Sequence, residues 1–149
     1  MSGVRFSART AEVALTAATA KTVVQIVAAS NHRVLVTAFY AFFDGVSPTA
    51  EPVVVRVLRQ TTAGTMSSLT PVKLNNSDDE TLQTTAQHTA TAEPTAGDVL
   101  FAMEVHPQTG YKELRPLGQE FVVPGGGRLG IECTAPAGVN VIAGFEGDE

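Results

Sequence analysis

An alternation of apolar and polar residues with a period of two dominates the chain from residue 22 to residue 145. The apolar runs are short, and Pro, Gly, Asn and Asp separate them, which is the pattern of β-strands joined by turns. Strand after strand without a helical period between them favours packed antiparallel sheets. The sequence therefore predicts an all-β protein built as a single antiparallel β-sandwich.

The turn residues divide the chain into predicted strands over 22–28, 33–43, 53–59, 98–106, 118–124, 128–133 and 139–145. Residues 61–94 are rich in Thr, Ser, Ala, Asn and Asp, and we expect short strands there near 70–74 and 86–91 that cross between the sheets. Residues 21–149 form the predicted sandwich domain. Residues 1–20 are rich in Ala and Thr, which predicts an edge strand or an N-terminal arm that adds little to the core and can grip a neighbour.

The longest apolar run, from Arg33 to Phe43, is apolar on both faces of the predicted strand. A strand of a lone antiparallel sandwich is usually polar on the side that faces water. We therefore predict that one face of this strand lies at an oligomer or capsid interface or under a covering segment. The candidate residues are Leu35, Phe39 and Phe43 on one face, or Val36, Tyr40 and Phe42 on the other.

The composition argues against several classes of protein. A chain of 149 residues and 15.6 kDa suits one domain. Ten basic and fifteen acidic residues give a net charge of -5, which disfavours binding to nucleic acid or to an anionic membrane. The single cysteine, Cys133, cannot form an intramolecular disulfide and is predicted to be buried in a strand. Without an apolar run long enough to span a bilayer or a credible signal peptide, we expect a soluble protein made in the cytoplasm.

Residue patterns that carry chemistry are sparse. The Gly125–Gly127 cluster lacks the Lys and Ser/Thr of a phosphate loop and is predicted to be a turn. Only Glu104 and His106 place two metal ligands on one strand face, and a zinc or iron site needs three or four. We therefore expect no metal, no cofactor and no enzymatic activity.

Several segments resemble small proteins encoded among the head genes of tailed bacteriophages, which act as head decoration or cement proteins. The resemblance rests on strand and turn patterns at residues 21–45, Pro52 to Arg59, Thr62 to Thr65, Pro124 to Ile131 and Glu146 to Glu149. It implies a jelly-roll-like sandwich that assembles as a homotrimer on the outer capsid surface of the virion. It also implies that the protein clamps neighbouring subunits of the major capsid protein and so stabilises the shell.

Two other readings remain open at this stage. Jelly rolls also host receptor- and carbohydrate-binding modules of virions and cell surfaces. Such a module needs an exposed aromatic residue beside polar groups, and Tyr111 is the candidate. A cupin-like enzyme would instead need a metal cluster assembled from His88, Glu104 and His106. The absent chemistry and the doubly apolar strand favour a structural protein over both.

Overall fold

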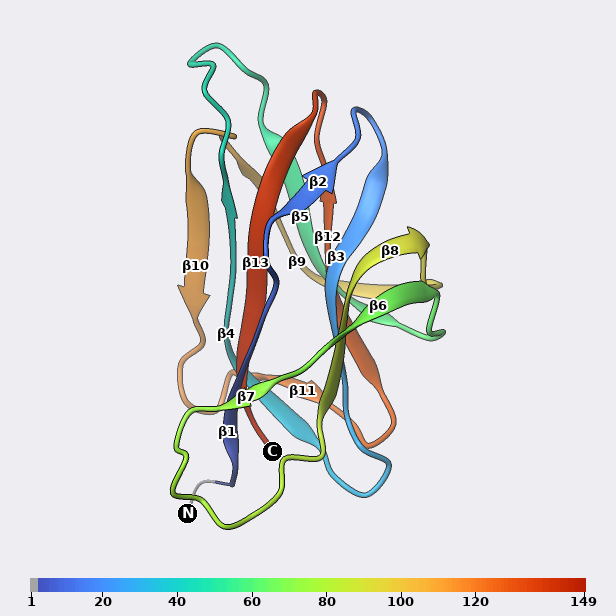
Figure 1. The fold of residues 1–149 in the computed structure, drawn as a ribbon, viewed down its shortest axis with the longest axis vertical. Coiled ribbons are helices and arrows are strands. Elements are labelled where there is room, and N and C mark those ends of the chain that lie inside the picture. Colours follow the sequence, from blue (N-terminus) through green and yellow to red (C-terminus); the bar gives the residue numbers. More distant parts are fainter. Residues whose placement is uncertain (1–2) are drawn as a thin grey trace.

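The computed structural model describes residues 3–149, which form thirteen β-strands in two antiparallel sheets. Among these residues no helix has the length and hydropathy needed to cross a membrane. The two sheets lie face to face with the apolar core between them, so the predicted β-sandwich is confirmed (Figure 1). The jelly-roll connectivity that the family resemblance implies stays a prediction.

Sheet A has seven strands in the order β10-β4-β13-β1-β7, with β11 also paired to β4 and β2 to β13. Its strands are β1 (Arg5–Arg9), β2 (Val13–Leu15), β4 (Val34–Phe43), β7 (Val72–Lys73), β10 (Gly110–Leu114), β11 (Phe121–Val123) and β13 (Val139–Asp148). Sheet B has six strands in the order β6-β8-β3-β12-β5-β9. These are β3 (Ala20–Val27), β5 (Val53–Gln60), β6 (Thr65–Leu69), β8 (Thr85–Ala92), β9 (Ala96–Val105) and β12 (Arg128–Thr134).

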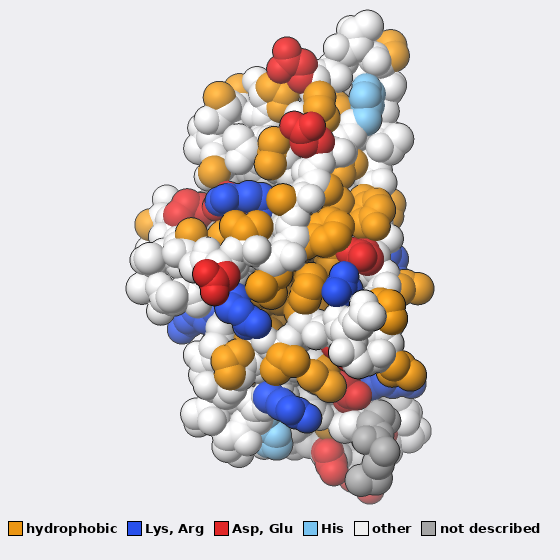
Figure 2. Space-filling view, turned by 180° about the vertical axis from the view of Figure 1, so that it is seen from behind, with side chains coloured by type: hydrophobic (Ala, Val, Ile, Leu, Met, Phe, Trp, Pro, Cys, Tyr) orange, Lys and Arg blue, Asp and Glu red, His pale blue; other side chains and the backbone are white. Residues whose placement is uncertain are grey.

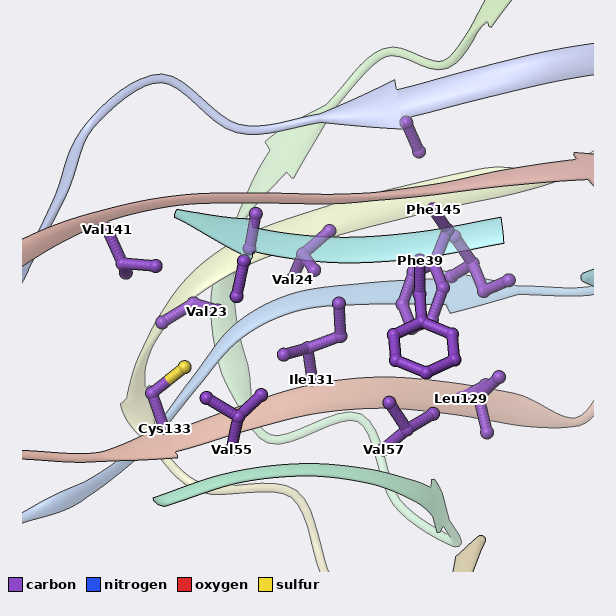
Figure 3. Close-up of a cluster of buried hydrophobic side chains, with 14 of the residues drawn as sticks. Val23, Val24, Phe39, Val55, Val57, Leu129, Ile131, Cys133, Val141 and Phe145 are labelled. Atoms are coloured by element: carbon purple, nitrogen blue, oxygen red, sulfur yellow. The ribbon is translucent and has the colours of Figure 1, made fainter. Parts of the chain in front are cut away.

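The core is made by the inward residues of both sheets (Figure 3). Phe39, Val141 and Phe145 come from sheet A, and Val57 and Ile131 are among those that face them from sheet B; all five are essentially inaccessible to solvent. Large side chains in such positions each contribute about 1.5–3 kcal/mol by leaving water. The interleaved aliphatic and aromatic residues fix how the sheets are spaced and therefore which residues remain outside.

The first twenty residues contribute more to the core than we expected. Strands β1 and β2 both pair with β13, and within β1 the side chains of Phe6 and Ala8 are completely buried. The physical reason is visible in the sequence, because Arg5 to Arg9 alternates polar and apolar residues. Within residues 3–20 this segment is part of sheet A rather than an arm outside the sandwich.

A β-bulge in β4 changes which of its residues face outward. In the pairing with β13, Ala38 lies opposite Glu146 and Val36 lies opposite Gly147, so Thr37 is an extra residue on β4. An extra residue shifts the alternation of side chains by one position. The inward side chains are therefore Val34 and Val36 before the bulge, and Phe39, Ala41 and Phe43 after it.

Candidate interaction surfaces

The outer face of sheet A carries three large side chains that the chain itself leaves partly uncovered. Phe42 is 46% exposed, and Ile142, which lies opposite it on β13, is 39% exposed. The half-buried ring of Tyr40 lies beside Phe42, with 6.0 Å between the ring centroids. We call Tyr40, Phe42 and Ile142 the aromatic patch. Large exposed aromatic residues grouped in this way are typical of protein interaction sites.

Two glycines make room for the aromatic rings on the outer face of sheet A. Gly110 lies opposite Phe42 on β10, and a Cβ atom at that position would overlap the Phe42 ring. Gly144 lies opposite Tyr40 on β13, and a Cβ atom there would come within 2.6 Å of the Tyr40 hydroxyl. A glycine in the middle of a strand often marks a close approach of this kind. The absence of a Cβ atom at Gly110 and Gly144 therefore provides the space that the two rings occupy.

Charged residues surround Tyr40. The ammonium of Lys112 lies 5.5 Å from the centre of the Tyr40 ring and 3.4 Å from a carboxylate oxygen of Glu146. Burial, helped by the charge of Glu146, raises the pKa of Tyr40, while the charge of Arg9 and a hydrogen bond with Ser7 act in the opposite direction. The patch is therefore an apolar centre with a charged rim.

A second apolar surface lies where the edges of the two sheets meet, along β9 and β10. The rings of Phe101 and Tyr111 stack there with their centroids 6.3 Å apart, and Phe39 meets Phe101 edge-on from the core at 5.2 Å. A cavity of about 400 Å³ opens beside them. We call Phe101, Met103 and Tyr111 the β9–β10 surface. Viewed from behind, hydrophobic side chains gather over this part of the molecule, with charged side chains around them (Figure 2).

The backbone of β9 is also left open on this side. Strand β9 is the last strand of sheet B, so its outer edge pairs with no other strand among residues 3–149. From Phe101 to Val105 its register with β5 is continuous, with no bulge. Proteins usually protect such edges with Lys, Pro or a bulge, because an open edge can pair with another chain. Residues 101–105 contain no Lys, Pro or bulge, and Glu104 is the one charged residue on this part of the edge.

The outer face of sheet B differs, because the chain covers it. The side chains of Gln25 and Gln60 are buried there and joined by a 2.6 Å hydrogen bond from Nε2 of Gln25 to Oε1 of Gln60. Gln60 in turn donates to the hydroxyl of Thr22, at 2.9 Å. Glu93, from the segment after β8, accepts hydrogen bonds from the backbone and hydroxyl of Thr22 at 2.7 and 2.8 Å. Buried polar groups satisfied in this way hold the covering segment in place.

The predicted interface residues separate into two groups that the sequence did not anticipate. We expected Leu35, Phe39 and Phe43 to share one face and Val36, Tyr40 and Phe42 the other. The bulge at Thr37 corrects this grouping. The structure places Val36, Phe39 and Phe43 in the core, while Leu35, Tyr40 and Phe42 lie on the outer side of β4 and keep part of their surface exposed.

The metal candidates do not come together in the structure. Within residues 3–149 no group of three or more His, Cys, Asp or Glu side chains could hold a metal ion. Both ring nitrogens of His106 face backbone groups, with Nε2 at 3.3 Å from the carbonyl of Pro48 and Nδ1 accepting the amide hydrogen of Gln108 at 3.1 Å. His106 thus fastens the loop after β4. Cys133 is buried, and its burial raises the pKa of its thiol to about 12.

Tyr111 belongs to a strand, whereas the sequence suggested a loop. It is 40% exposed and pairs with Ala41 through β10. Glu104 lies opposite Val54 on β5 and is exposed, and together with Met103 and Tyr111 it lines the cavity beside the Tyr111 ring. Sequence reasoning missed Ile142 as a surface residue. Gly110 and Gly144 are the residues in the sequence that could have located this surface. A glycine inside a strand often marks a place where a neighbouring side chain lies close to the backbone.

Comparison with protein-family models, with curated proteins and with solved structures finds no match for this chain.

Proposed function

We propose that the protein is a structural virion protein that decorates the outer surface of a phage capsid and stabilises it. In this proposal copies of the chain associate with one another, as a homotrimer, and bind the major capsid protein. The observation that carries the proposal is the aromatic patch, whose rings lie against Gly110 and Gly144 and remain partly exposed. The resemblance to decoration proteins, which covers most of residues 21–146, supports the choice of a capsid as the target.

The proposed mechanism is binding rather than catalysis. A protein that binds the intact shell and not its opened form stabilises the shell by mass action. Each copy contributes a modest apolar contact, and linking copies multiplies the affinity because the second and third contacts form at a high effective concentration. A rigid patch helps, because little side-chain freedom is lost when its rings are covered.

The test is to add the purified protein to capsids prepared without their decoration protein. The wild type should bind at a fixed copy number and raise the temperature at which the shell opens. Phe42→Asp should abolish binding, because burying a charge without a partner is costly. Leu117→Asp is the matched control, since Leu117 is 95% exposed in the turn after β10 and outside the patch. No binding by the wild type, or equal binding by Phe42→Asp, would overturn the proposal.

The structure makes deletion of residues 1–20 unsuitable as a test of capsid binding. Phe6 and Ala8 are buried in the core, so the deletion would remove part of sheet A together with any contact that the segment makes. Single substitutions on the outer face avoid this difficulty.

A receptor- or carbohydrate-binding module is the second candidate function. The observation that favours it is the exposed ring of Tyr111 beside a cavity of about 400 Å³, a volume within the range of ligand pockets. It ranks second because few polar groups at the cavity are free to bind a ligand. Glu104 and His106 both line it, but both ring nitrogens of His106 already face backbone groups. Titration with methyl glycosides, followed by the chemical shifts of Tyr111, separates the two functions.

A further inference from the structure

The aromatic patch and the β9–β10 surface are separate but adjacent. Both involve β10, in which Lys112 lies beside Tyr40 on the outer face and Tyr111 turns toward Phe101 on the other side of the strand. One chain therefore presents two different apolar surfaces that meet along a single edge strand. A partner that covers only one of them leaves the other in water.

We propose that the β9–β10 surface of one copy docks on the aromatic patch of the next copy, so that identical contacts close into a ring. This inference deepens the proposed self-association and rests on it. A contact between two different surfaces of the same chain generates a closed ring when the rotation between copies closes, and a trimer is the ring that the proposed function requires. The alternative arrangement is a two-fold dimer that pairs the two surfaces reciprocally, and a wild-type mass of two chains would identify it.

The charges of the two surfaces complement each other. Arg9 lies on the outer side of β1 opposite Gly144, which itself lies opposite Tyr40, and the Arg9 side chain makes no hydrogen bond or ion pair with residues 3–149. Glu104 lines the cavity of the β9–β10 surface, and its carboxylate is equally without a partner in that part of the chain. Unlike charges on facing surfaces steer association and fix the register of the contact.

The open edge of β9 is a second reason to propose that another copy of this chain covers the β9–β10 surface. Residues 101–105 expose unpaired backbone groups next to the apolar side chains of Phe101 and Met103. An open edge that carries a single charged residue is tolerated in a soluble protein when another chain covers it. A second copy of this chain supplies that cover in the ring without any further partner.

The decisive experiment is a mixing test with two variants, each defective in one surface. Wild type should show about three times the 15.6 kDa chain mass by light scattering. Phe42→Asp and Tyr111→Asp should each be monomeric, because each puts an unpaired charge into every interface of the ring. A mixture of the two should form a species of twice the chain mass, because the intact β9–β10 surface of Phe42→Asp can dock on the intact patch of Tyr111→Asp. Leu117→Asp should keep the wild-type mass.

Thermal unfolding of each variant verifies that it is folded before mixing.

A charge exchange provides a second, milder test of the same contact. Arg9→Glu and Glu104→Arg should each weaken association about tenfold at low salt, and the double variant should recover it. Monomeric wild type, a mixture that stays monomeric, or a double variant weaker than either single one would overturn the ring. If monomers still bind capsids, the capsid proposal stands and only the ring fails.

Discussion

Part of the outer face of sheet B is covered by the segment that contains Glu93, whereas Phe42 and Ile142 on the outer face of sheet A remain partly exposed. The covered part holds polar residues beside the buried Leu58, and its Gln25 and Gln60 side chains are buried and hydrogen-bonded to each other. The bare face holds aromatic rings. Hydrogen bonds give the chain's own segment a unique position, because an unpaired buried amide is costly. Apolar rings impose no such requirement, and they stay available for a partner.

The largest expected effect separates two neighbouring phenylalanines of β4. Phe39→Asp should prevent folding, because loss of the buried ring alone costs about 4 kcal/mol and the new charge has no partner in the core. Phe42→Asp, on the outer face, should leave the unfolding temperature of the monomer nearly unchanged. Circular dichroism of both variants checks this difference. A folded Phe39→Asp protein would show that the bulge at Thr37 is misplaced and that the two faces have been exchanged.

A pH titration probes the inner side of sheet B. Burial raises the pKa of Cys133 from 9.0 to about 12, so its neutral form is favoured in the folded state. Stability should therefore be complete below pH 9 and fall by about 4 kcal/mol as the pH rises toward 12. Cys133→Ala should remove most of this slope. Burial also raises the pKa of Tyr40, on the outer side of sheet A, so Tyr40→Phe should reduce the pH dependence of stability as well. The reduction should be smaller than for Cys133→Ala, because Tyr40 is only partly buried. Equal slopes in all three proteins would contradict the burial of Cys133.

Matched truncations compare the two outer faces directly. Gln60→Ala should cost about 3 kcal/mol, because Gln25 and Thr22 lose their partner under the covering segment. Ile142→Ala on the bare face should cost about 1 kcal/mol or less in the monomer, since part of that side chain is already in water. Chemical denaturation of both variants measures the two values. Similar costs would mean that the two faces are equally covered in solution.

The smallest expected effect concerns Thr89, where β8 bends away from β3 and the segment that covers sheet B begins. Thr89 has a φ of 54°, a left-handed conformation that a β-branched residue rarely adopts, at the point where β8 leaves its pairing with β3. Thr89→Asn should raise the free energy of unfolding by about 1 kcal/mol, because Asn tolerates this conformation better. The gain will be reduced by loss of the contact between the Thr89 hydroxyl and Nδ1 of His88. A large loss of stability would show that this contact holds the bend.

Period-two patterning predicted the sandwich, most of its strands and the burial of Cys133, because each depends on local alternation. The outward set on β4 could not be predicted, since the bulge at Thr37 depends on how β4 pairs with β13, a strand about a hundred residues away. A second bulge, at Val23 in β3, has the same origin. Strand β10 was missed because Gly110 and the charged residues after it resemble a loop, and pairing with β4 overrides that local preference.

Strand β13 is the centre of sheet A, although it comes from residues 139–148, and it pairs with β4 on one side and with β1 and β2 on the other. During synthesis on the ribosome, β1 and β4 emerge long before the strand that joins them. Sheet A can therefore close only after translation has passed residue 148, and until then the inward face of β4 is available to chaperones and to aggregation. A premature stop codon before residue 139 would consequently divide sheet A between β4 and β1, and not merely shorten it by its last strand.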